Sequence, residues 1–323
     1  MKNVLILSAG RRVELIEAFR AELGVLIPGA KVFAADLTPQ LAPACQVADG
    51  AFSVPRATSA EYCDRIVDIC IDNAIGMVIP TIDTELMVLS ERVGDFTARG
   101  IHLVISSVEL VANCRDKRKT AAFLEQLGIR SPRIYDVENI TFPCFAKPYD
   151  GSCSVGAAIV ENKDSLTRDM LHNPRMMFAE LIGKDHAEYT IDAYYNKSGQ
   201  LCCLVPRERI EVRGGEVSKG ATRKHALYEY LLPRLKTVVG ARGCLTFQFF
   251  TKLEGDSYLA IEINPRFGGG YPLSYAAGAN YPGWLIREYL LGEEIGFFDQ
   301  WESNLLMLRY DAKVLVHGHA AAQ

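Results

Sequence analysis

Two short runs of β-favouring residues, 245–250 and 258–263, lie on either side of a polar turn that contains Gly255. Aromatic and β-branched side chains in both runs favour extended backbone. Side chains two positions apart in a strand share a face, so Glu262 and Asn264 point in the same direction. The pattern predicts a β-hairpin that has one polar face.

The register of this hairpin decides which side chains meet. If residues 254–256 form a symmetric turn, Gln248 lies directly opposite Glu262, with Cβ atoms roughly 5 Å apart. The side-chain oxygens of Gln248, Glu262 and Asn264 then converge, a ligand set that suits Mg²⁺ when nucleotide phosphates complete its octahedron. A two-residue turn would shift the register by one and turn Gln248 away.

The residues after the second strand also suit a phosphate. Pro265 ends the strand, Arg266 follows where its cation can meet a phosphate oxygen, and the glycines of 268–270 let the backbone approach a ligand. The alternative is a surface hairpin whose polar side chains are merely solvated.

The first third of the chain alternates short apolar runs with helical patterns. The expected strands are residues 3–7, 31–35, 76–80 and 101–105, and the first helix has apolar positions at 13, 16, 19 and 23. A capping box at Thr58 and Glu61 predicts a helix that runs to Ala74. Strand and helix in alternation predict a parallel sheet, with Gly10, Asp36 and Asp83 at one edge where an acceptor could bind.

The loop after the first strand has one glycine instead of G-x-G-x-x-G. The dinucleotide fingerprint is therefore absent, and a nicotinamide-dependent dehydrogenase is disfavoured. Asp36 is better explained as a loop carboxylate or an acceptor contact than as a ribose ligand.

Composition excludes several other classes. With 49% hydrophobic residues, 23% charged residues and a formal charge of −4, the chain is expected to be globular and to lack the basic field of a nucleic-acid partner. Nine scattered cysteines without a C-x-x-C pair, and no signal peptide or apolar membrane span, favour a cytoplasmic location and exclude a membrane partner.

Three features of the middle of the chain suit a nucleotide. Lys117 opens a helix over residues 116–127, and helix N-termini attract anions. Lys147 emerges from an apolar strand, where a buried ammonium needs an anion. A Gly/Ser loop over 150–156 follows, and its amide groups could close over phosphates. The alternatives are a solvated lysine in a charged run and an ordinary turn.

The IEINPR string at 261–266, preceded by a strand that carries Gln248, resembles the metal-binding hairpin of ATP-grasp enzymes. The resemblance is closest to the synthetase units of the carbamoyl phosphate synthetase large subunit, and it spans roughly residues 116–291. It implies a Rossmann-like pre-ATP-grasp domain (1–112), which contains the parallel sheet, followed by a two-lobed ATP-grasp domain (113–323). The fold class is α/β plus α+β, with a lid lobe over about 117–182 and a large lobe over about 183–323.

The resemblance also implies roles for particular residues. Lys117, Lys147 and Ser152 would contact phosphate, Glu180, Leu181 and Ile182 would hold adenine, and Glu188 would bind ribose. One residue more separates Glu180 from Glu188 than in the synthetase pattern, which leaves the ribose ligand open. Gln248, Glu262 and Asn264 would bind the metal, and Arg266 and Lys147 would be catalytic.

The chain between this region and the hairpin carries four cations, Arg207, Arg209, Lys219 and Arg223. They suit anion or acceptor recognition, or they are ordinary surface charge. A strand is expected over 201–212, helices over about 222–241 and 281–291, and a last strand over 305–316.

The implied activity is an ATP- and Mg²⁺-dependent ligase that activates a carboxylate as an acyl phosphate for attack by an amine or similar nucleophile. The cofactors would be ATP and one or two Mg²⁺ ions, with Mn²⁺ as a substitute; the partners would be small-molecule carboxylates and amines, and a homo-oligomer is left open. The alternatives are a catalytically silent ATP-binding sensor or regulatory subunit, and phosphorylation of bicarbonate or carbamate. The chain holds only one synthetase-like unit, which disfavours carbamoyl phosphate synthesis alone, and it lacks the arginine-rich strand of a biotin carboxylase.

Overall fold

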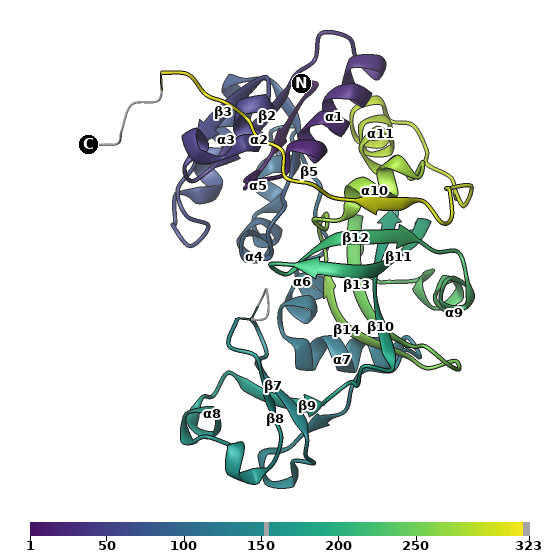
Figure 1. The fold of residues 1–323 in the computed structure, drawn as a ribbon. Helices are drawn as coiled ribbons and strands as arrows, with labels where there is room; N and C mark the ends of the chain where they lie inside the picture. Colours follow the sequence, from purple (N-terminus) through teal and green to yellow (C-terminus); the bar gives the residue numbers. More distant parts are fainter. Residues whose placement is uncertain (152–154, 319–323) are drawn as a thin grey trace.

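The computed structural model describes residues 1–151 and 155–318, which form three β-sheets with helices packed around them (Figure 1). A parallel sheet forms the amino-terminal end of the molecule. A large antiparallel sheet occupies the middle, and a small antiparallel sheet projects at the opposite end. The expected α/β plus α+β class is confirmed.

The amino-terminal sheet has five parallel strands in the order β3-β2-β1-β4-β5. Its strands are β1 (Asn3–Ile6), β2 (Val32–Asp36), β3 (Gly50–Ser53), β4 (Ile75–Ile79) and β5 (His102–Leu103). The helices of this region are α1 (Val13–Leu26), η1 (Pro39–Leu41), α2 (Pro43–Val47), α3 (Tyr62–Asp72), α4 (Asp83–Glu91), α5 (Val93–Thr97) and α6 (Val108–Arg115).

Two details differ from the expectation. The sheet has a fifth strand, β3, which was missed because it is a short edge strand without a buried apolar run. The prediction of a capping box at Thr58 is also wrong, because α3 begins at Tyr62 and its cap residue Glu61 makes no side-chain capping hydrogen bond. The parallel arrangement itself is as predicted.

Alternation along β1 divides the core. Val4 and Ile6 lie in one apolar cluster with Phe19 of α1, whereas Leu5 and Leu7 lie in another with residues of α3. The first cluster continues without a break into the large sheet and includes Phe247. The amino-terminal region and the large sheet therefore share one core.

The small sheet has the order β6-β9-β7-β8 and is antiparallel. Its strands are β6 (Ile134–Tyr135), β7 (Cys144–Pro148), β8 (Ala158–Val160) and β9 (Met176–Glu180), joined through η2 (Val137–Asn139), η3 (Lys163–Ser165) and α8 (Arg168–His172). Helix α7 (Lys117–Gln126) precedes it and ends as predicted before Gly128, which has a positive φ.

The large sheet is antiparallel in the order β14-β13-β10-β11-β12-β15. Its strands are β10 (His186–Tyr195), β11 (Leu201–Arg213), β12 (Glu216–Thr222), β13 (Gly243–Lys252), β14 (Tyr258–Asn264) and β15 (Leu306–Leu308). The helices packed on it are α9 (Ala226–Leu235), α10 (Tyr271–Ala276), α11 (Tyr281–Leu285) and the π-helical η4 (Ile286–Leu291) that continues α11.

The expected helix over 222–241 is too long at both ends. Thr222 ends strand β12, and α9 begins four residues later. The last strand is also much shorter than expected, because only Leu306–Leu308 pairs with β12. Within the ranges that the structure describes, no helix has both the length and the apolar character needed to cross a membrane.

Candidate active site

The β13–β14 hairpin has the predicted polar face. Gln248 pairs with Glu262 across the ladder. The predicted turn over residues 254–256, however, is wrong. Thr251 pairs with Tyr258, and the amide of Lys252 donates to the carbonyl of Ser257, which leaves residues 253–256 as the turn. A β-bulge on β14 makes up the difference, because the register shifts by one residue between Gln248 and Phe249.

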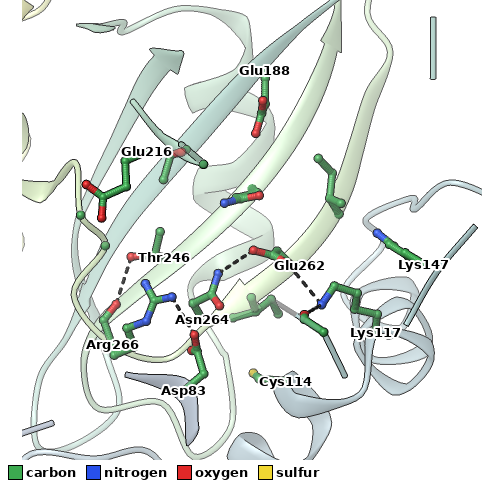
Figure 2. Close-up of a pocket in the computed structure, with 18 of the residues that line it drawn as sticks. Asp83, Cys114, Lys117, Lys147, Glu188, Glu216, Thr246, Glu262, Asn264 and Arg266 are labelled. Atoms are coloured by element: carbon green, nitrogen blue, oxygen red, sulfur yellow. Dashed lines mark hydrogen bonds and ion pairs between the residues drawn. The ribbon is translucent and has the colours of Figure 1, made fainter. Parts of the chain in front are cut away.

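The three proposed metal ligands line a single cavity of about 700 Å³, together with residues of the small sheet and the amino-terminal sheet. The side-chain amide of Asn264 donates to Glu262 Oε1 at 3.0 Å (Figure 2). In the described part of the chain, no three His, Cys, Asp or Glu side chains are grouped as metal ligands. Gln248, Glu262 and Asn264 offer one carboxylate and two amides, a set that fits Mg²⁺ with phosphate oxygens as further ligands.

Lys117 connects the hairpin with the start of α7. Its Nζ lies 3.5 Å from Glu262 Oε2 and donates to the carbonyl of Gly151 at 2.5 Å (Figure 2). The cap residue Asp116 accepts from the amide of Arg118, as an N-terminal helix cap does. The predicted phosphate-binding lysine is therefore placed between the hairpin and the glycine loop.

Lys147 lies near the end of β7 and lines the same cavity. Burial, with a further contribution from the charge of Lys117, lowers the pKa of Lys147 to about 8. An anion beside it would favour its charged form. Gly151 of the following loop lines the cavity, whereas the predicted ligand Ser152 lies outside the described residues.

The proposed adenine and ribose residues stand along the same cavity. Glu180 is the last residue of β9, Leu181 and Ile182 follow it, and all three line the cavity. Glu188 of β10 also lines it and lies 2.9 Å from Arg209 Nε. Burial raises the pKa of the Glu188 carboxyl, and Arg209 partly opposes that rise.

Arg266 links the hairpin to the amino-terminal sheet. Its Nη2 donates to Asp83 Oδ2 at 2.8 Å, and its carbonyl accepts from Thr246 Oγ1 at 3.0 Å (Figure 2). Burial opposes the charge of Arg266, but the neighbouring Asp83 carboxylate outweighs this, and the pKa of Arg266 lies above its ordinary value. Asp83, expected at the edge of the sheet, therefore reaches the cavity, whereas Gly10 and Asp36 hydrogen-bond to each other at 3.0 Å.

The four cations of the large sheet divide into two pairs. Arg207 and Arg209 line the cavity. Arg207 is buried and donates from Nε and Nη2 to Asp192 at 2.7 and 3.0 Å, so its charge is already paired. Lys219 and Arg223 lie outside the cavity, paired with glutamates of β11 at 2.6 and 2.8 Å, and the geometry does not support them as substrate ligands.

Several cavity residues were not expected from the sequence. They are Arg12 and Thr81 from the amino-terminal region, Cys114 from α6, Glu216 from β12 and Thr246 from β13. Glu216 was missed because β12 itself was missed. Arg12 follows the first predicted loop directly, and its position before a helix at the carboxyl edge of a parallel sheet was an available signal.

Comparisons with known proteins give two family matches. A family model described as the PylC-like N-terminal domain matches residues 4–104, and one described as ATP-grasp in the biosynthetic pathway with Ter operon matches residues 172–307. No curated protein sequence matches the chain significantly.

Solved structures share the fold over nearly the whole chain. The biotin carboxylase domain of Hydrogenobacter thermophilus 2-oxoglutarate carboxylase is 16% identical, with a TM-score of 0.74 over 94% of this chain and 73% of that one. The L-amino acid ligase of Bacillus licheniformis is 19% identical (TM-score 0.67; 90% and 74% covered). N5-Carboxyaminoimidazole synthetase of Staphylococcus aureus is 14% identical (TM-score 0.68; 92% and 79% covered).

Because these sequence identities are low, the structural similarity establishes the fold and does not identify a substrate. The two family matches fall on the amino-terminal sheet and on the part that contains the large sheet, and the ATP-grasp resemblance of the hairpin is confirmed. Residues 4–104 therefore match the PylC-like amino-terminal domain, residues 172–307 match an ATP-grasp family, and the chain has the fold of the ATP-grasp ligases.

Proposed function

We propose that this protein is a ligase that uses ATP and Mg²⁺ to activate a small-molecule carboxylate as an acyl phosphate, which an amine or similar nucleophile then attacks. The observation that carries the proposal is the convergence of the hairpin ligands, both lysines and Arg266 on one cavity. These residues come from the hairpin, from α7 and from β7. If the hairpin were an ordinary surface hairpin with solvated side chains, these residues would not be expected to converge.

The same cavity has room for a nucleotide along its length. Leu181 and Ile182 would hold the adenine, and Glu188 would accept from the ribose hydroxyls. Lys117 and Lys147 would neutralise the phosphates, which suits the lowered pKa of Lys147 because a bound anion restores its charge. Structures with related folds contain ADP with magnesium, or ADP, which supports the choice of ligand.

When bound, Mg²⁺ would supply charge compensation at the terminal phosphates, held by Gln248, Glu262 and Asn264. Arg266 would bind the carboxylate substrate and the phosphoryl group in transit, since Asp83 orients its guanidinium. A carboxylate oxygen attacks the γ-phosphorus, the bond to the β-phosphate oxygen breaks, and ADP leaves. The amine nitrogen then attacks the acyl carbon, phosphate leaves, and the amine proton passes to water.

We also propose the domain division and the location expected from the sequence. The boundary at residues 112 and 113 falls within α6, so the two domains would be joined by a continuous helix. The lobe boundary at residues 182 and 183 falls in the connection between β9 and β10. The scattered cysteines favour a reducing cytoplasm; each of those that the structure describes is free.

A turnover assay tests the proposal. The protein is incubated with ATP, Mg²⁺ and pools of amino acids, and the release of ADP and phosphate is followed. At least one pool should stimulate release. If none does while ATP still binds, the proposal fails and an ATP-binding sensor is the better description. If bicarbonate alone stimulates release, phosphorylation of bicarbonate replaces the amine ligase.

A further inference from the structure

Arg12 is a cation of the cavity wall that has no acidic partner among the residues that the structure describes. It lies directly before α1, and its Nη2 donates to the carbonyl of Thr81 at 2.7 Å. Across the residues for which coordinates are described, no carboxylate comes within 4.0 Å of its guanidinium. Every other arginine at this end of the cavity has such a partner.

The neighbouring acids are already engaged. Asp83 pairs with Arg266 at 2.8 Å, and Glu216 lies 3.1 Å from Arg309 and 3.5 Å from Arg11. These acids contact other arginines, and Arg12 is left without an ion pair within 4.0 Å among the described residues. Figure 2 shows Glu216 and Asp83 on either side of Arg266.

Burial is the main cause that lowers the pKa of Arg12, to about 10, and the charge of Arg266 lowers it further, whereas the more distant carboxylates of Glu216, Asp83 and Glu85 partly oppose this. The guanidinium is still charged at neutral pH. Holding a partly buried cation without an ion-pair partner beside a second cation is unfavourable unless a ligand supplies the opposite charge. The planar guanidinium suits a carboxylate or phosphate, which it can bind through two parallel hydrogen bonds.

We propose that the carboxylate substrate has a second anionic group and that Arg12 binds this group, while Arg266 holds the carboxylate that is activated. The inference rests on the proposed function for the role of Arg266. The substrate class is then a dianionic acid, either a dicarboxylate or an acid with a phosphate or phosphonate group. Its far end reaches the amino-terminal sheet, which would make Arg12 a residue that determines specificity.

The test is a binding measurement that needs no turnover. Calorimetry in the presence of ADP and Mg²⁺ compares malonate, succinate, glutarate and adipate with the monoamide of each. At least one diacid should bind the wild-type protein about tenfold more tightly than its monoamide, the effect of a charge-assisted hydrogen bond. 3-Phosphonopropionate distinguishes the two kinds of second anionic group, a carboxylate and a phosphate or phosphonate. If it binds more tightly than succinate, the phosphate or phosphonate group is preferred.

Variants assign the preference to one side chain. Arg12→Gln should abolish the diacid preference and leave ADP affinity unchanged, and Arg12→Lys should retain part of it. The adjacent Arg11→Gln is the matched control, because the Arg11 side chain is 79% exposed and should not affect the preference.

No diacid preference in the wild-type protein, or a preference that survives in Arg12→Gln, would overturn the proposal. Loss of the diacid preference in the Arg11→Gln variant as well would indicate a general effect of positive charge and would also overturn the proposal. A diacid preference without ADP release in the turnover assay would leave this site standing and remove the ligase activity.

Discussion

Gln248 lies directly opposite Glu262 in the β13–β14 ladder, and a bulge on β14 keeps it there. The turn at 253–256 alone would have set the strands one position out of step, with Gln248 on the face away from Glu262. The bulge at Ile261 adds the missing residue. The turn shifts the strand register by one residue and the bulge shifts it back. Together they produce the polar face on which the proposed metal site depends.

The carboxylate of this face can be tested by a single substitution. Glu262→Gln keeps the shape of the side chain but removes the one charged ligand, so we expect ADP release to fall by about 100-fold or more, as it does when a group that stabilises phosphoryl transfer is lost. The measurement is the rate of ADP release as a function of Mg²⁺ concentration.

Glu254→Gln is the matched control, because Glu254 lies exposed in the turn of the same hairpin. Its rate should match that of the wild-type protein. An unchanged rate in Glu262→Gln would remove Glu262 from the metal site, and equal losses in both variants would point to a damaged hairpin.

Lys147 predicts a pH dependence of nucleotide binding. Its pKa of about 8 means that the free protein loses this positive charge as the pH rises through 8. Since the charged form would contact phosphate, the dissociation constant of ATP should rise above pH 8, by up to about tenfold per pH unit. Equilibrium binding measured between pH 7 and 10 checks this.

Lys147→Arg separates this explanation from a general effect of pH, because a guanidinium stays charged throughout the range. The variant should bind ATP with little change between pH 7 and 10. If the variant and the wild-type protein weaken in parallel, another group is responsible and Lys147 is not a phosphate ligand.

Long, regular patterns were the predictable part of this fold. The apolar periodicity around Phe19 and the helix stop at Gly128 correctly indicated α1 and α7. β3 and β12 were not predictable in this way, because each contains small or polar residues whose strand conformation depends on a neighbouring strand. The position of Arg12 before a helix was a local signal, but its proximity to the charge of Arg266, which lies 254 positions away, was not predictable from the local pattern.

The buried pair of Arg207 and Asp192 is expected to matter for stability. Asp192 also accepts from Ser274 Oγ at 2.6 Å, and it is fully buried. Asp192→Asn would leave the guanidinium of Arg207 buried without a counter-charge, which costs about 3–5 kcal/mol of the free energy of unfolding. Urea denaturation measures this loss.

The exposed pair of Glu211 and Lys219 on the same sheet is the comparison. Glu211→Gln should change the free energy of unfolding by less than about 1 kcal/mol. A loss of similar size in both variants would mean that burial does not determine how much the Arg207 pair contributes to stability.

The contact between Arg266 and Asp83 predicts a coupling across the two parts of the molecule. Asp83→Asn keeps a hydrogen-bond acceptor but removes the charge that orients Arg266, so we expect ADP release to slow by about tenfold to 100-fold while the affinity for ATP stays unchanged. Arg266→Met should slow the reaction further. The double variant should be no slower than Arg266→Met alone, because Asp83 acts through Arg266 and has nothing left to orient. Asp311→Asn is the control, since Asp311 pairs with Arg213 on the exposed surface. Additive losses in the double variant would show that Asp83 has an independent role, such as binding the amine. A loss of ATP affinity in Asp83→Asn would place Arg266 at the nucleotide instead of at the carboxylate substrate.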